Sequence, residues 1–175
     1  MVALTFTACG SGSKTEVSTQ TTPDSNSGAG STSGSRGAGS SSPTDLCSII
    51  TAEDAAAVFG EPATAQESTA PEPLAVGVCL YGGESEDFTV RNLLQVRVYE
   101  GEQFYGREIF KDAKPLANLG DEAFVYFNDP GNSVDVQFLK DGKTGTVNYT
   151  AGQSVDIESK IPELERVARR LAASI

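Results

Sequence analysis

The first 44 residues contain almost no side chain that a folded domain could bury. Between Gly10 and Thr44 the chain consists largely of Gly, Ser and Thr, with Val17 as its only large aliphatic residue and no aromatic residue. A segment of this composition cannot offset the entropy that it would lose on ordering, so we expect residues 10–44 to be a disordered linker. The rest of this 175-residue chain, residues 45–175, has the length and composition of one globular domain.

Cys9 lies between this linker and a short apolar stretch at residues 2–8. An apolar stretch that ends in a small residue, here Ala8, and is followed by a cysteine resembles a bacterial lipobox, in which the cysteine becomes lipid-modified, for example with palmitate. We interpret residues 1–9 as a truncated signal peptide, because no basic residue precedes the apolar stretch. The expected location is the extracytoplasmic face of the cell membrane, with the lipid on Cys9 as anchor. The alternative is a cytosolic protein with a chance cysteine near its start.

Two further cysteines, Cys47 and Cys79, lie in the expected domain. If Cys9 carries lipid, these two remain as one pair, and an oxidising compartment would favour a disulfide between them. The alternative is two separate buried thiols. The sequence predicts no metal site, since zinc requires about four Cys, His or carboxylate ligands and the chain contains no His.

The net charge of −11 falls on the domain, because the acidic and basic residues of the linker balance. An acidic domain without basic clusters is a poor binder of nucleic acid, whose phosphates require Lys and Arg. It is also poorly suited to lie flat on an anionic membrane surface. The expected partners are therefore the membrane, through the lipid on Cys9, and an envelope protein or a small ligand.

The hydrophobic pattern of the domain predicts three helices. The first begins after Thr51, with Asp54 in a capping-box position, and ends at Gly60. A second is expected over residues 102–113 and a third over residues 159–173. In the third, Glu165 and Arg169 would form an outward pair four residues apart.

Five segments alternate or cluster apolar residues as strands do: residues 76–81, 93–99, 123–127, 134–138, and a returning strand that contains Val147 and Tyr149. The segment Asp141-Gly142 predicts a tight hairpin turn, and residues 129–132 predict another turn. Hairpins join strands in antiparallel order. The predicted fold class is therefore α+β, with a mostly antiparallel sheet of about five strands and helices packed on one face.

Three segments carry a resemblance to a known family. They are residues 45–51 followed by an Ala-rich helix, Cys79 in the next strand, and residues 119–124 before a strand, with an Ala/Arg/Leu helix closing the chain. Together they resemble a family of small cell-envelope lipoproteins from high-GC Gram-positive bacteria whose domain has no known function. The resemblance implies a disulfide between Cys47 and Cys79 and an envelope location, and it implies no activity.

Several catalytic and cofactor signatures are excluded. Without His there is no Ser-His-Asp or Cys-His machinery. The segment Gly142-Lys143-Thr144 ends like a phosphate-binding loop, but Gln137 stands where the motif requires Gly. Residues 129, 132 and 135 lack the spacing and closing Glu of a calcium loop. No cofactor and no catalytic residue are predicted.

Polar residues on the predicted strands are the remaining candidates for a site. If helices cover only one side of the sheet, the other side would present a polar face, which we interpret as a binding surface made by Gln95, Arg97, Asp135, Gln137, Thr146 and Asn148. Such a face is also what an ordinary solvated sheet shows. The sequence therefore favours a non-catalytic binding or interaction module. The alternative is a hydrolase of wall polymers that uses carboxylates alone, which would require two carboxyl groups facing each other across a cleft.

Overall fold

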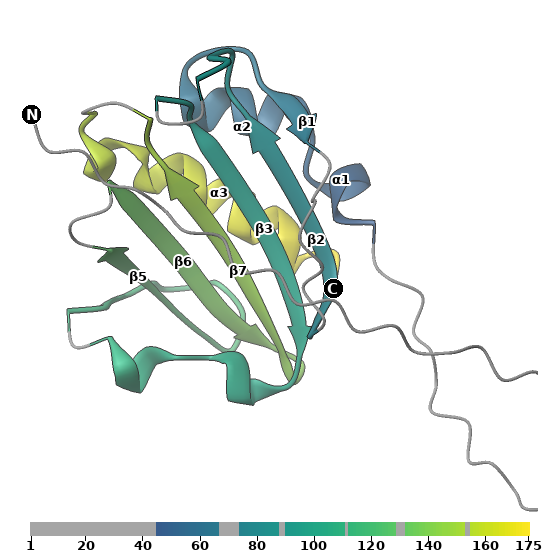
Figure 1. Cartoon of the computed structure of the whole chain (residues 1–175). Coiled ribbons are helices and arrows are strands. Elements are labelled where there is room, and N and C mark those ends of the chain that lie inside the picture. Colours follow the sequence, from purple (N-terminus) through teal and green to yellow (C-terminus); the bar gives the residue numbers. More distant parts are fainter. Residues whose placement is uncertain (1–44, 67–73, 88–89, 111, 129–131, 153–154) are drawn as a thin grey trace, which may run out of the picture. The chain divides into compact units, whose positions relative to one another are not determined.

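One antiparallel sheet of seven strands organises the described part of the chain in the computed structural model (Figure 1). The strands lie side by side in the order β1-β2-β3-β7-β6-β5-β4. The structure describes residues 45–66, 74–87, 90–110, 112–128, 132–152 and 155–175, all within a compact unit of residues 39–175. The strands are β1 (Thr64–Gln66), β2 (Ala75–Gly82), β3 (Leu93–Glu100), β4 (Lys114–Pro115), β5 (Glu122–Asn128), β6 (Ser133–Lys140) and β7 (Lys143–Thr150).

The α+β class and the antiparallel sheet are confirmed, whereas the expected number of about five strands is wrong. The two additional strands are the short edge strands β1 and β4, which pair with β2 and β5 and are three and two residues long. Segments this short carry no alternation that a sequence pattern can reveal. Their strand conformation comes from the neighbouring strand that they pair with.

Three helices pack on one face of this sheet, behind it in Figure 1: α1 (Leu46–Ile49), α2 (Ala52–Phe59) and α3 (Ile161–Ala172). The predicted capping box of α2 is present, since the side chains of Thr51 and Asp54 each accept a hydrogen bond from the other residue's backbone N–H. Gly60 ends α2 with a φ of 78°, a left-handed conformation that favours glycine. The expected Glu165–Arg169 pair on α3 is also present.

The described residues of the segment 102–113 do not form the expected helix. The segment contains two short 3₁₀ helices instead, η1 (Glu102–Phe104) and η2 (Arg107–Ile109), and then leads into β4. Two features disfavour a continuous α-helix here. Gly101 and Gly106 flank η1. The backbone N–H of Gly106 also donates to the Gln137 side chain on the sheet, at 3.3 Å, instead of to a helical carbonyl. The segment runs along the lower end of the sheet in Figure 1.

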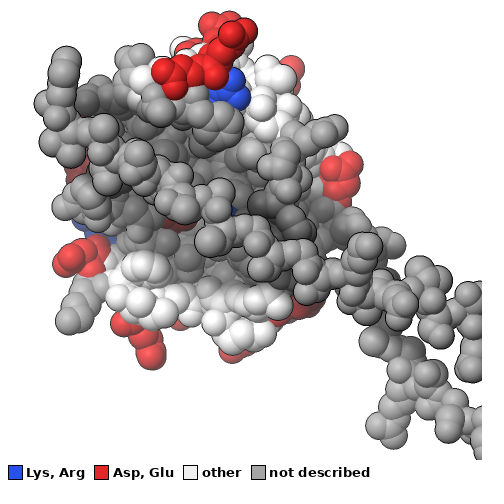
Figure 2. All heavy atoms as spheres, viewed as in Figure 1, with Lys and Arg blue, Asp and Glu red and all other residues white. Residues whose placement is uncertain are grey.

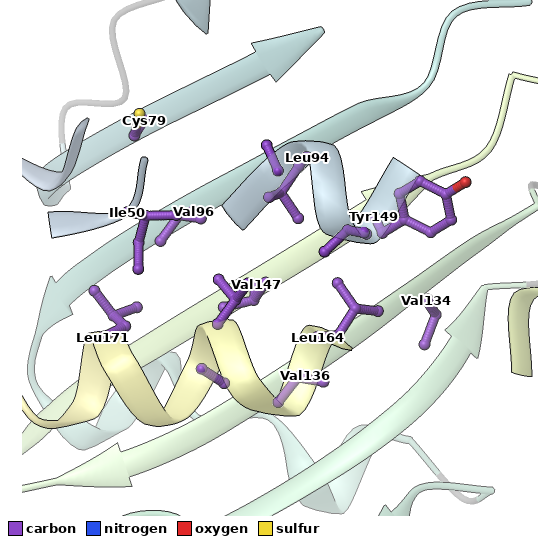
Figure 3. Close-up of a cluster of buried hydrophobic side chains, with 14 of the residues drawn as sticks. Ile50, Cys79, Leu94, Val96, Val134, Val136, Val147, Tyr149, Leu164 and Leu171 are labelled. Carbon is purple, nitrogen blue, oxygen red and sulfur yellow. The ribbon is translucent and has the colours of Figure 1, made fainter. Parts of the chain in front are cut away.

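The hydrophobic core lies between the helices and the sheet (Figure 3). Leu164 and Leu171 of α3 face Val96, Val136 and Val147, which come from the three central strands β3, β6 and β7. All of these side chains are fully buried. Burying a side chain of this size contributes about 1.5–3 kcal/mol, so the contact between α3 and the sheet is a main source of stability.

Gly145 of β7 makes room for a large ring in this core. It pairs with Phe138 on β6, and a Cβ atom at Gly145 would lie 2.2 Å from the ring carbon Cζ of Phe138. Because the ring is fully buried, it has no free space to move into. The only residue without a side chain therefore stands where the Phe138 ring crosses the neighbouring strand.

A disulfide joins Cys47 to Cys79, as the sequence predicted, with 5.3 Å between the two Cα atoms. It links α1 to β2. Beside it, the hydroxyl group of Tyr81 on β2 donates to the backbone carbonyl of Ile50, at 2.5 Å. Covalent and polar contacts thus hold the start of the domain against the sheet.

Several expectations fall on residues that the structure does not describe. These are the lipid site at Cys9, the signal peptide and linker over residues 1–44, and the turn at residues 129–131. Within the described part of the chain, no helix has the length and apolar character needed to cross a membrane.

Candidate functional site

The polar residues that the sequence singled out lie together on the sheet face opposite the three helices. The strand register aligns them in two cross-strand rows. In the first row Gln95 of β3, Asn148 of β7 and Asp135 of β6 are neighbours, and in the second row Arg97, Thr146 and Gln137 are neighbours. We call these six residues the polar rows. Their grouping follows from side-chain alternation, because every second residue of a strand points to the same face.

Asp135 is a buried carboxyl group in the first polar row, with only 6% of its surface exposed. One of its oxygens, Oδ2, accepts hydrogen bonds from the side-chain amides of Asn128 and Asn148, at 2.6 and 2.9 Å. The Tyr126 hydroxyl also hydrogen-bonds to it, and the Arg97 guanidinium acts on it as a nearby positive charge. Burial nevertheless dominates and raises the pKa of Asp135 above its ordinary value.

The network around Asp135 extends onto β5. Tyr126 and Asn128 are residues of that strand, and Tyr126 stands directly opposite Asp135 in the register. Burial, together with the charge of Asp135, raises the pKa of Tyr126 to about 12. The phenol therefore keeps its proton at neutral pH and can donate to the carboxylate.

The segment with η1 and η2 packs against one end of this face through aromatic rings. The ring of Phe110 stacks on Tyr126, with 3.7 Å between centroids, and Tyr105 meets Phe124 edge to face at 5.1 Å. The helix-free face is therefore not polar throughout. An aromatic cluster made by Tyr105, Phe110, Phe124 and Tyr126 borders the polar rows on the β5 side.

Sequence reasoning missed Tyr126, Asn128 and this aromatic cluster. The sequence predicts a dense apolar strand over residues 123–127, and residues 123–126 are all buried. The signal that would have found Tyr126 is the alternation of Phe124, Tyr126 and Asn128, which places all three on the face of the polar rows. The contacts of Phe110 could not have been found in this way, because the segment was expected to be helical.

At the edge of the view in Figure 2, the coloured charged side chains are mostly acidic. The polar rows contain one acidic and one basic residue, Asp135 and Arg97. Among the described residues, no group of three or more Cys, Asp or Glu side chains is placed to hold a metal ion. The rows are thus nearly balanced in charge within an acidic domain.

A cleft of about 450 Å³ lies beside η2 and the start of β5, lined by Tyr105, Arg107, Glu108 and Glu122. It brings together two carboxyl groups, which is what the hydrolase alternative requires. Glu122 forms an ion pair with Arg107, however, and both side chains are more than two-fifths exposed. The general acid of a glycosidase typically lies in a buried, apolar site, and this exposed ion pair does not provide one. The geometry therefore supports catalysis less well than binding.

Comparison of the chain with models of protein families, with curated proteins and with solved structures found no match. The function of the helix-free face is therefore inferred from the geometry and charge of its own residues.

Proposed function

We propose that the domain is a non-catalytic binding module of the cell envelope, held at the outer face of the cell membrane by a lipid on Cys9. The polar rows are its binding surface. The observation that carries this proposal is the buried carboxyl group of Asp135, surrounded by amides, a phenol and a guanidinium on the sheet face without helices. A buried charge costs stability, and a solvated sheet face has no structural need for one.

Two observations support the location. The Cys47–Cys79 disulfide is the kind of bond that forms outside the cytoplasm. The order of apolar stretch, Cys9 and Gly/Ser/Thr-rich linker fits a lipid-anchored domain, and so does the resemblance to small envelope lipoproteins. A linker of about 35 residues with this composition would span roughly 30–35 Å, enough to carry the domain clear of the lipid headgroups.

Native mass spectrometry of the full-length protein, extracted from its own membranes, tests the anchor. We expect the mass of a lipid on Cys9 and the loss of two hydrogens from Cys47 and Cys79. The C9S variant should lack the lipid and leave the membrane fraction. An unmodified wild-type protein with free thiols would contradict the proposed location.

The same spectra test the binding surface. We expect the wild-type protein to retain a non-covalent adduct from the envelope and the double variant Q95A/N148A to lose it. The matched control is E158A, an exposed residue away from the polar rows that pairs only at the surface with Lys114. If E158A and Q95A/N148A retain the same adduct, or if the wild-type protein carries none, the polar rows are not the binding surface.

A further inference from the structure

Thr146, at the centre of the second polar row, has a hydroxyl group that the protein leaves without a hydrogen-bond partner. The residue is only 5% exposed, and its Oγ1 atom is fully buried. The two other threonines on the same face of β7 do have partners: Thr144 donates to the backbone carbonyl of Gly101 at 2.9 Å, and Thr150 donates to Asn148 at 3.3 Å. A buried hydroxyl group without a partner destabilises the protein, so a ligand that pairs with Thr146 gains affinity. The other described hydroxyl group of this kind is that of Tyr105, which lies at the cleft beside η2 and outside the polar rows.

The charges around Thr146 select the kind of ligand. An anion would meet the buried carboxyl group of Asp135 in the neighbouring row, and a cation would meet the guanidinium of Arg97 beside Thr146. An ion of either sign is thus repelled by one of these groups while it is attracted by the other, so the site favours neither sign of net charge. A ligand without net charge avoids both repulsions.

The hydrogen-bonding groups around Thr146 further restrict the chemical class of the ligand. The side-chain amides of Gln95, Gln137 and Asn148 all hydrogen-bond within the protein. Each amide can donate and accept more than one bond, so the same groups can also pair with a ligand, and Thr146 adds a hydroxyl group. A ligand with several hydroxyl groups matches this set, because each hydroxyl group can also donate and accept. On the β5 side the stacked rings of Phe110 and Tyr126 add an apolar border of the kind found at ligand sites.

We infer that the polar rows bind an uncharged saccharide, one of whose hydroxyl groups pairs with Thr146. This inference rests on the proposed function of the same face and names the chemical class of its ligand. The long side chains of Arg97 and Gln137 flank Thr146 in the register. The ligand reaches the threonine when one of these side chains turns aside.

Titration of the full chain with short sugars tests the inference, with the C9S substitution in every protein to keep it in solution. The neutral probes are the tetramers of N-acetylglucosamine, glucose and mannose, and the charged probes are the cationic glucosamine tetramer and the anionic galacturonate tetramer. Calorimetry should detect binding of at least one neutral tetramer. Neither charged tetramer should bind as tightly.

The T146V variant provides the decisive comparison, because valine keeps the shape of threonine and removes only the hydroxyl group. Since that group has no partner in the free protein, T146V should unfold at the same urea concentration as the parent or a higher one. It should bind the neutral tetramer about fivefold to tenfold more weakly, as expected for the loss of one hydrogen bond. Unchanged affinity in T146V would overturn the inference.

The matched control is T144V, two residues away on the same strand and face. Its hydroxyl group has a partner within the protein, so T144V should unfold at lower urea concentration and keep the affinity of the parent. Binding of no neutral tetramer would overturn the saccharide inference. In that case the adduct experiment decides about the binding surface. If Q95A/N148A loses the adduct that the wild-type protein carries from its membranes, the polar rows remain the proposed binding surface. If it keeps the adduct, both proposals are wrong.

Discussion

Asp135 and Asp54 are buried carboxyl groups whose environments differ. Asp54 faces two guanidinium groups, whereas Asp135 has amides and a phenol as hydrogen-bond partners and a single guanidinium nearby. The pKa of Asp54 is lowered and that of Asp135 is raised. Ionisation of Asp135 therefore opposes folding, which is the behaviour expected of a residue retained for binding rather than for stability.

Replacing Asp135 tests this reading. We expect D135N to be as stable as the parent at neutral pH or about 1 kcal/mol more stable, because asparagine removes the cost of a buried charge. The folded state raises the pKa of Asp135. The destabilisation caused by its charge is therefore absent below about pH 4, develops as the pH rises through the folded pKa, and persists at higher pH. Urea unfolding at a series of pH values measures the difference. A D135N variant that is clearly less stable at pH 7 would show that the ionised carboxylate supports the fold.

At the scale of elements, Asp54 joins two helices that are more than 100 residues apart in the chain. It accepts from Arg166 and Arg170 of α3, both at 2.7 Å, and it belongs to the capping box of α2. Burial alone would raise the pKa of Asp54, but the backbone N–H of Thr51 and the two guanidinium groups outweigh burial and lower it. The carboxylate thus positions α2 against α3.

We expect D54N to lose about 2–3 kcal/mol of stability at neutral pH. The loss is smaller than for a fully buried ion pair, because both arginine side chains are about half exposed. The lowered pKa means that this contribution is present above about pH 4 and is lost as the pH falls through the folded pKa, so the difference from the parent should shrink there. Thermal unfolding across pH 3–7 measures it. The E165Q variant, which breaks only the surface pair with Arg169, should change stability by less than about 0.5 kcal/mol. Equal effects of the two variants would contradict the role of Asp54.

The segment of residues 102–113 shows why one element could not be predicted. Its apolar residues recur at spacings that suit one face of a helix, so the sequence pattern predicts a helix. In the structure Tyr105 and Phe110 instead contact rings on β5. The sequence shows the alternation of apolar and polar residues in β5 and β6. It does not show that the rings of β5 contact the segment of residues 102–113.

At the scale of the whole molecule, the Cys47–Cys79 disulfide closes a loop with a sequence separation of 32 residues. The bond removes conformational freedom from the unfolded chain, which for a loop of this length corresponds to about 3–4 kcal/mol. The double variant C47A/C79A should therefore unfold at markedly lower urea concentration. Reduction of the wild-type protein by dithiothreitol should have the same effect and should leave the variant unchanged. A variant as stable as the oxidised wild type would show that the bond is dispensable for the fold.

The α+β class, the five long strands, the capping box of α2 and the side of each strand on which the polar residues lie all follow from the sequence alone. The sequence also offered the Cys47–Cys79 disulfide, with two separate thiols as the alternative. These features depend on local periods and on residue chemistry, which a chain carries without reference to its fold. The burial of Asp135, the missing partner of Thr146 and the stacking of Phe110 on Tyr126 become visible only in the folded chain. Each of these depends on strand order and on contacts between distant segments, which no local pattern contains.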